Sequence, residues 1–119
     1  KIMVQRFIQT PKQTDKRILL LNGEVLGVFG RKPPLVDFRS NLSVGGSMHR
    51  AVLSAEDRKI VRRIAPSLVK NGLYYAGSDV MGKYLTEINV TSPSGIPEIN
   101  TLYWKKVQES VAEFIESKI

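Results

Sequence analysis

Strand-length runs of apolar residues, separated by turn-forming residues, recur along the chain. Residues 17–21 and 24–29 are two such runs, with Asn22-Gly23 between them. Both turn residues tolerate the positive φ angles of a type I′ turn, so the pattern predicts a β-hairpin. Three more runs predict strands, and they span residues 3–8, 73–81 and 84–90, the last two being joined at Gly82-Lys83.

Two stretches carry apolar residues at helical spacing. The first begins at Ser54, a common N-cap residue, and ends at Asn71-Gly72. Pro66 lies inside it and predicts a kink or a break, because proline lacks a backbone N–H. The second is one amphipathic helix near the C-terminus whose apolar face should cover the sheet. That face consists of Tyr103, Trp104, Val107, Val111, Phe114 and Ile115.

Residues 30–53 show neither period and are expected to be irregular and functional. The remaining elements predict an α/β (α+β) fold with a mostly antiparallel sheet of about five strands and two main helices. With 119 residues, of which 42% are hydrophobic and 24% charged, the chain is expected to form a single domain over residues 1–119. It opens on Lys1 rather than Met and enters a strand-like run at once, so we expect it to be part of something longer.

Composition excludes several classes of function. The absence of cysteine excludes disulfides, thiolate metal sites and cysteine nucleophiles. The longest purely aliphatic run, residues 18–21, is far shorter than the ~20 residues of a membrane span. The net charge of +7 is concentrated near the start, where residues 1–40 carry eight Lys or Arg against three Asp or Glu. Nucleic acid and small anionic substrates explain this charge equally well.

The first candidate site combines Asp79 with Glu87 and Asn89. Side chains alternate across a strand, so Glu87 and Asn89 share one face. Two carboxylates and an amide are oxygen ligands that suit a hard cation such as Mg²⁺. A two-residue loop at Gly82-Lys83 would place Asp79 opposite Thr86, whereas a three-residue loop would place it opposite Glu87. The metal hypothesis therefore predicts the three-residue loop, and the alternative is an ordinary polar face of a half-solvated hairpin.

The second candidate site is a set of basic and small residues. Arginine offers a planar fork for phosphate and carboxylate oxygens, and paired glycines let a ligand approach the backbone. A solvated basic loop with turn glycines is the alternative. The lone His49 has no visible partner for chemistry and is expected at the surface. The set comprises Arg17, Arg31, Arg39, Asn41 and Gly45-Gly46.

These motifs together resemble bacterial glutathione synthetase, an ATP-grasp ligase. Tyr84-Leu85-Thr86-Glu87-Ile88-Asn89-Val90-Thr91-Ser92-Pro93 is similar to the end of the family signature. Three further segments resemble the family in the same order along the chain. They are Asp15-Lys16-Arg17-Ile18-Leu19-Leu20 with Asn22-Gly23-Glu24, Arg39-Ser40-Asn41-Leu42 with Gly45-Gly46, and Gly72-Leu73 to Gly77-Ser78-Asp79.

The resemblance implies a cytoplasmic ligase that uses ATP and Mg²⁺ (or Mn²⁺) to join γ-glutamylcysteine and glycine through an acyl phosphate. The partners of this ligase would be these small molecules, with no nucleic acid and no membrane. The resemblance is also compatible with a homo-oligomer of the full-length enzyme. Asp79, Glu87 and Asn89 would hold the metal, and Arg31 and Arg39 would serve catalysis and substrate binding. Ser92 and Pro93 would border the peptide substrate. The nucleotide would meet Gln5, Phe7, Ile8, Arg17, Asn41, Gly45 and Gly46.

The resemblance also implies that this chain is the C-terminal lobe of the ATP-grasp unit, without the N-terminal domain and the first lobe. The isolated chain is then expected to be inactive, because ATP-grasp chemistry places the nucleotide between two lobes. One departure is Ser47, where the family commonly has arginine. Two alternatives stay open. One is an ATP-grasp glutamate ligase that modifies ribosomal-protein tails, and the other is a small basic nucleic-acid-binding module.

Overall fold

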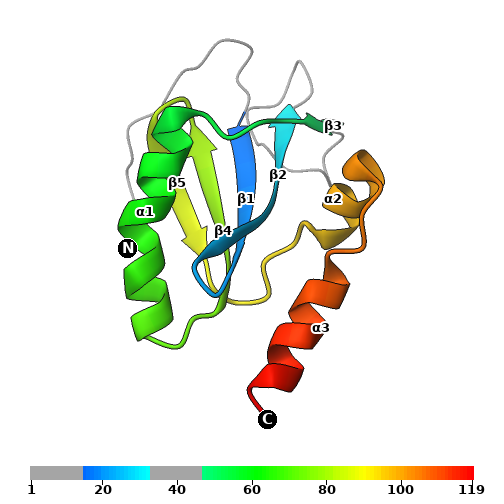
Figure 1. Ribbon diagram of the computed structural model, residues 1–119. Coiled ribbons are helices and arrows are strands. Elements are labelled where there is room, and N and C mark those ends of the chain that lie inside the picture. Colours follow the sequence, from blue (N-terminus) through cyan, green and yellow to red (C-terminus); the bar gives the residue numbers. More distant parts are fainter. Residues whose placement is uncertain (1–14, 33–46) are drawn as a thin grey trace, which may run out of the picture.

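An antiparallel sheet organises the part of the chain that the computed structural model describes, residues 15–32 and 47–119 (Figure 1). Within these ranges the sheet has five strands in the spatial order β3-β2-β1-β4-β5. The strands are β1 (Asp15–Leu21), β2 (Glu24–Lys32), β3 (Ser47–Arg50), β4 (Tyr75–Met81) and β5 (Tyr84–Asn89), and the helices are α1 (Ala55–Lys70), α2 (Ile96–Tyr103) and α3 (Gln108–Ser117). The expected mostly antiparallel α/β fold is confirmed. No helix in the described ranges is long and apolar enough to cross a membrane.

The predicted hairpin at Asn22-Gly23 joins β1 to β2. Both turn residues have positive φ angles, 53° and 80°, as a type I′ turn requires. Leu21 pairs with Glu24 next to the turn, but the register shifts by one residue further on, between Leu19 and Leu20. This β-bulge leaves Leu26 as the extra residue on β2 and displaces every later pair of the hairpin.

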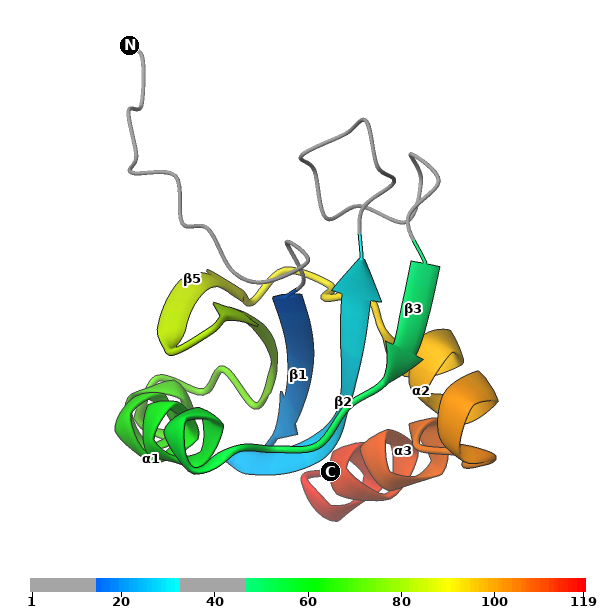
Figure 2. The same ribbon diagram turned by 90° about the horizontal axis from the view of Figure 1, so that it is seen from above.

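The two faces of the sheet are covered by different helices, because side chains alternate along each strand. On one face, Ile18 and Leu20 of β1 pack with Val61 and Leu68 of α1. On the other face, Leu19 and Phe29 pack with Ile99 of α2 and with Val107. In both views α1 lies at one end of the sheet and the α2–α3 pair at the other (Figure 2).

Helix α1 begins where the sequence predicts, with Ser54 as its N-cap. The Ser54 hydroxyl accepts a hydrogen bond from the Asp57 backbone N–H, and the Asp57 carboxylate accepts one from the Ser54 N–H. This is a complete capping box in which aspartate takes the place of the more usual glutamate. Asp57 is fully buried and also forms a 2.7 Å ion pair with Lys16 of β1. The cap therefore fastens α1 to the sheet.

Two segments of the chain are more regular than the sequence predicts. Helix α1 is not broken at Pro66, because the exposed proline costs only one backbone hydrogen bond in a helix anchored on both sides of it. Residues 30–53 are not irregular throughout, since β2 runs to Lys32 and β3 pairs with it. The predicted strand at residues 3–8 lies outside the described residues.

The single C-terminal helix predicted from the sequence is wrong, because two helices are present. Trp104 adopts a left-handed conformation with φ of 57° and ends α2. Its side chain is 89% exposed rather than part of the apolar face. The Asn100 side chain then accepts a hydrogen bond from the Val107 N–H and donates one to Gln108, which fixes the corner. Helix α3 buries no residue fully, so α2 supplies most of the cover on this side.

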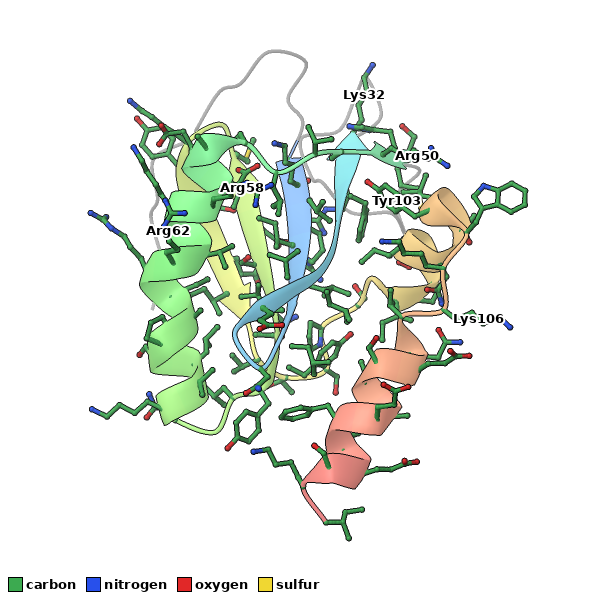
Figure 3. The ribbon with its side chains drawn as sticks, viewed as in Figure 1. Lys32, Arg50, Arg58, Arg62, Tyr103 and Lys106 are labelled. Carbon is green, nitrogen blue, oxygen red and sulfur yellow. The ribbon has the colours of Figure 1, made fainter. Side chains whose placement is uncertain are left out.

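Tyr103 holds helix α2 against the edge of the sheet. The Tyr103 hydroxyl donates to the Ala51 carbonyl and accepts from the Ala51 N–H, both at 2.8 Å. Arg50 lies over the Tyr103 ring, 5.5 Å from its centroid (Figure 3). Closer to the centre, Ile99 occupies the space that a side chain on Gly27 would need, since a Cβ there would lie 2.5 Å from the Ile99 methyl carbon.

We expect Ile99→Ala to lower the free energy of unfolding by about 2–5 kcal/mol, because it empties a buried site above a glycine that cannot fill the space. Urea denaturation of the 119-residue chain measures this. Ile115→Ala on α3 is the matched control, and it should change stability by less than about 0.5 kcal/mol because Ile115 is 55% exposed. Equal losses in the two variants would contradict the assignment of α2 to the core.

Candidate functional site

The register of the β4–β5 hairpin brings Asp79 opposite Glu87, but not through the loop that the metal hypothesis predicts. Met81 pairs with Tyr84, so the turn at Gly82-Lys83 has two residues and the predicted three-residue loop is wrong. A β-bulge between Asp79 and Val80 supplies the missing shift. Thr86 is the extra residue on β5, and its hydroxyl donates to the Asp79 carbonyl at 3.1 Å.

Cross-strand pairing places the candidate residues in one row. Arg17 of β1 pairs with Asp79 of β4, and Asp79 pairs with Glu87 of β5. Directly paired residues point to the same face of an antiparallel sheet. Asn89 lies on this face as well, two residues beyond Glu87 and opposite Gly77. The sheet thus brings three oxygen donors and an arginine together from three strands.

The centre of the row is a buried ion pair between Arg17 and Asp79. Arg17 donates through Nε to Oδ1 at 2.5 Å and through Nη2 to Oδ2 at 3.0 Å. Both side chains are 7% exposed. Arg31 Nη2 lies 3.1 Å from the same Asp79 Oδ1. Asp79 therefore has both oxygens engaged by arginine, and a metal ion at this carboxylate would share them.

Arg31 also holds Asp15, which lies opposite it in the β1–β2 hairpin. Its Nε donates to Asp15 Oδ1 at 3.0 Å and its Nη2 donates to Oδ2. Burial raises the pKa of Asp15, and the hydrogen bonds and charge of Arg31 offset this only in part. Burial alone would lower the pKa of Arg31, but Asp15 and Asp79 outweigh it and raise the pKa above its ordinary value. Two arginines and two aspartates thus form one compact network.

Glu87 and Asn89 differ from Asp79 in their surroundings. Glu87 is exposed, and no described residue forms a hydrogen bond or ion pair with its carboxylate. Asn89 is half-buried, and its side-chain oxygen accepts from the Thr91 N–H at 3.0 Å. In the described ranges no three acidic or histidine side chains converge as a metal site, so the candidate set is two carboxylates and one amide. These donors fit a hard divalent cation that keeps several waters.

The loop that follows β5 folds back over the same face. Arg17 Nη1 donates to the Ser94 carbonyl at 3.0 Å, and the Tyr75 hydroxyl donates to the Pro93 carbonyl at 3.3 Å. Burial raises the pKa of Tyr75 further above neutral pH, where the hydroxyl is already protonated and able to donate this bond. Ser92, which precedes Pro93, is exposed and has φ of 50°. The loop that the resemblance assigns to the substrate is thereby tied to the residue that pairs with Asp79.

The structure assembles part of the predicted site and leaves part of it undescribed. Arg17, Arg31 and Asp79 lie together, with Glu87 and Asn89 beside them. Sequence reasoning missed the roles of Asp15, Tyr75 and Ser94 as partners of this network. Of these partners, only Asp15 could have been found from the sequence, because Asp15 and Arg31 flank the predicted hairpin, whose pairing brings them together. The predicted site residues that lie outside the described residues are Gln5, Phe7, Ile8, Arg39, Asn41, Gly45 and Gly46.

Comparison with known proteins shows the family of this chain. The family model described as prokaryotic glutathione synthetase, ATP-grasp domain, matches residues 1–104. The chain belongs to this family. Glutathione synthetase of Thermosynechococcus vestitus is 42% identical over 116 residues, which cover 98% of this chain and 36% of that protein. The Gloeobacter violaceus enzyme is 44% identical over 114 residues, covering 96% and 35%.

Membership of the prokaryotic glutathione synthetase family confirms the resemblance seen in the sequence and the assignment to an ATP-grasp domain. The five-stranded antiparallel sheet with helices on both faces is consistent with an ATP-grasp domain. The chain spans only about 36% of the length of these relatives, whereas they cover nearly all of it.

We expect Arg17→Gln to lower the free energy of unfolding by about 3–5 kcal/mol, because it leaves the buried Asp79 carboxylate without its two-pronged partner. Urea denaturation of the 119-residue chain measures the change. Lys59→Gln is the control, since its 3.9 Å pair with Glu56 is exposed and contributes at most about 1 kcal/mol. A loss for Arg17→Gln no larger than that of the control would show that the network does not hold the sheet together.

Proposed function

We propose that this chain supplies the metal- and substrate-binding part of an ATP- and Mg²⁺-dependent carboxylate–amine ligase that joins γ-glutamylcysteine to glycine. One observation carries the proposal. Asp79 and Glu87 are paired on neighbouring strands, with Asn89 on the same face, beside the buried Arg17 and the half-buried Arg31. The names of the relatives support the same activity. The chain would be the C-terminal lobe of the ATP-grasp unit within a longer enzyme.

In the proposed reaction, a carboxylate oxygen of γ-glutamylcysteine attacks the γ-phosphorus of ATP, so that ADP leaves and an acyl phosphate forms. The glycine amine then attacks the acyl carbon, phosphate leaves, and the amine loses a proton. Negative charge grows on phosphoryl oxygens in the first step and on the carbonyl oxygen in the second. Cationic groups fixed beside these atoms lower both barriers, because they need no reorganisation when the charge develops.

Asp79, Glu87 and Asn89 are the proposed ligands of Mg²⁺ or Mn²⁺. When bound, the cation neutralises charge on the ATP phosphates. Glu87 offers an exposed carboxylate that no described residue engages, so it can bind metal without first breaking a contact within the described part of the chain. Arg17 and Arg31 hold Asp79 in position, so the direction of its carboxylate is fixed. The same contacts already occupy its oxygens. We therefore assign Glu87 the larger share of metal affinity and Asp79 the orientation of the site.

Arg17 and Arg31 are the proposed anion-binding residues of the described part. The guanidinium of Arg17 already bridges Asp79 and the Ser94 carbonyl, so an anion bound there would be fixed relative to both the metal ligands and the substrate loop. Arg31 contributes positive charge at Asp79 Oδ1, the same oxygen that Arg17 Nε contacts. Arg39 is proposed to act on the transferring charge. Ser92 and Pro93 are proposed to border the peptide, with Pro93 held by Tyr75.

Synthesis of glutathione by the full-length enzyme tests the proposal. With Mg²⁺-ATP, γ-glutamylcysteine and glycine, it should release one ADP for each tripeptide formed. The 119-residue chain alone is the negative control and should release none, because it spans only about 36% of its relatives. Replacing glycine with glutamate tests the glutamate-ligase alternative. Faster ADP release with glutamate and a protein-tail acceptor would overturn the proposed substrates.

We expect Glu87→Gln in the full-length enzyme to weaken Mn²⁺ binding at least about tenfold and to reduce ligation in proportion, because a metal-ligating carboxylate becomes a neutral amide. Its unfolding free energy should hardly change, because Glu87 is exposed. Isothermal titration with Mn²⁺ and the ADP assay measure both effects. Glu113→Gln on α3, also exposed, is the matched control. Near-normal Mn²⁺ affinity in Glu87→Gln would remove Glu87 from the metal site.

For Arg39→Ala in the full-length enzyme we expect kcat to fall by about 100-fold, because a fixed cation next to developing charge is lost. The affinity for ATP should change much less, since the proposed role concerns the transferring charge rather than the bound nucleotide. Steady-state kinetics and equilibrium binding of a non-hydrolysable ATP analogue separate these effects. A loss of ATP affinity with kcat unchanged would assign Arg39 to nucleotide binding instead.

A further inference from the structure

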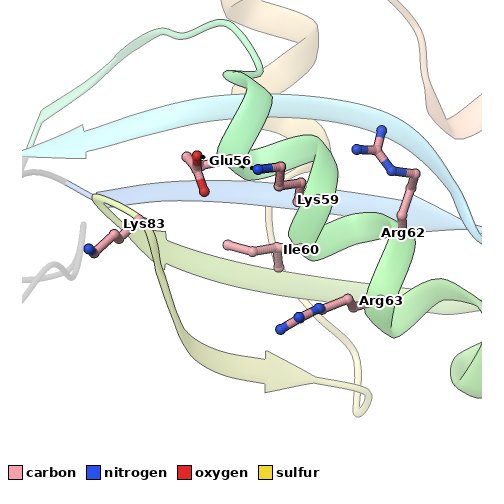
Figure 4. Close-up of a pocket in the computed structure, with 6 residues that line it drawn as sticks. All are labelled: Glu56, Lys59, Ile60, Arg62, Arg63 and Lys83. Carbon is pink, nitrogen blue, oxygen red and sulfur yellow. Dashed lines mark ion pairs between the residues drawn. The ribbon is translucent and has the colours of Figure 1, made fainter.

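A basic hollow lies between α1 and the turn that joins β4 to β5 (Figure 4). It has a volume of about 410 Å³. Ile60 is half-buried, and Arg63 extends to the same side of α1 as Ile60. Arg62 points to the other side of the helix. The residues around it are Glu56, Lys59, Ile60, Arg62, Arg63 and Lys83.

This hollow is separate from the site described above. Helix α1 packs against the face of the sheet that carries Ile18 and Leu20. Arg17 and Asp79 lie on the opposite face, since Arg17 alternates with Ile18 along β1. None of the residues around the hollow belongs to the Asp15, Arg17, Arg31 and Asp79 network.

The charge around the hollow is strongly unbalanced. Four of its six lining residues are basic and one is acidic. Among the described residues, Glu56 is the only acid within ion-pair distance of any of these cations, and its 3.9 Å contact with Lys59 is loose and exposed. Lys83 Nζ lies 5.6 Å from the centroid of the Tyr84 ring.

The spacing of these cations on α1 opposes helix stability. Lys59 and Arg63 are four residues apart, and Arg58 and Arg62 repeat the spacing one residue earlier (Figure 3). Like charges at this spacing lie next to each other and repel. Cations near the start of a helix are also unfavourable next to the positive end of its dipole. An anion held between α1 and Lys83 would relieve both effects.

The size and lining of the hollow favour a small ligand over a nucleic acid. Sites for small molecules commonly have volumes of about 300–1,000 Å³, and this hollow falls within that range. Single-stranded nucleic acid is usually bound by aromatic side chains on which bases stack. Among the described residues, none that lines this hollow is aromatic. Its cations lie on helix α1 and on the turn between β4 and β5, so they can contact two anionic groups at once.

We propose that this hollow is a second anion site, which binds a small molecule carrying two or more phosphate or carboxylate groups. Arg63 and Lys83 contact the anionic groups from opposite sides, and Lys59 adds charge once Glu56 is displaced from it. Ile60 packs against the uncharged part of the ligand. This binding needs no metal and no turnover, so it is independent of the ligase activity proposed above.

Calorimetric titration of the full-length enzyme in metal-free buffer at constant ionic strength tests the proposal. Pyrophosphate and citrate are the probes for the phosphate and carboxylate classes, and inorganic phosphate is the comparison with a single anionic group. We expect one of the two probes to bind clearly more tightly than inorganic phosphate. Arg63→Gln combined with Lys83→Gln should weaken that binding about tenfold, because two exposed charge contacts are lost.

Arg58→Gln combined with Lys106→Gln is the matched control, since it also removes one arginine and one lysine from exposed positions away from the hollow (Figure 3). Its affinity should stay within about twofold of the unmodified enzyme. Equal affinity in the two double variants would place the anion elsewhere and overturn the assignment. It would also be overturned if neither probe bound, or if a single-stranded oligonucleotide bound more tightly than both.

Discussion

The buried pair between Arg17 and Asp79 is the interaction on which the candidate site depends. Removing both charges from water is costly, and only close, two-pronged hydrogen bonding repays that cost. If Asp79 moved away from Arg17, this buried carboxylate would lose its two-pronged pairing, and Arg31 would be its one remaining cation among the described residues. The positions of β1 and β4 are fixed relative to each other as a result, and the Ser94 carbonyl is fixed with them through the third nitrogen of the same guanidinium.

The strict alternation of side chains along β1 separates stability from chemistry. Ile18 and Leu20 face α1 and form part of its core, while Arg17 and Leu19 face the other way. Lys16 faces α1 as well and reaches the buried Asp57 at the start of that helix. Neighbouring residues on one strand thus fasten a helix on one face and position a carboxylate on the other, so the fold and the site share a single strand.

Local signals in the sequence predict the elements well, because they depend on neighbouring residues alone. Asn22-Gly23 predicts its hairpin through backbone conformation, and Ser54 predicts the start of α1 through side-chain capping. The partners within the site are harder to predict because they depend on strand register. A two-residue turn at Gly82-Lys83 leads to the wrong partner for Asp79, and only the bulge at Thr86 corrects it. The left-handed Trp104 that divides the C-terminal helices is likewise invisible in the helical spacing of the apolar residues, and the Asn100 side chain holds the corner through the Val107 N–H.

The two bulges make the number of residues in β2 and β5 as important as their identity. Each bulge adds one residue, at Leu26 in β2 and at Thr86 in β5, and each of these lies between a turn and a site residue. A substitution along these strands alters one side chain, but a deletion of one residue would turn Arg31 or Glu87 to the opposite face. The sheet can therefore accept replacements along β2 and β5 far more readily than a change in the number of residues between each turn and Arg31 or Glu87.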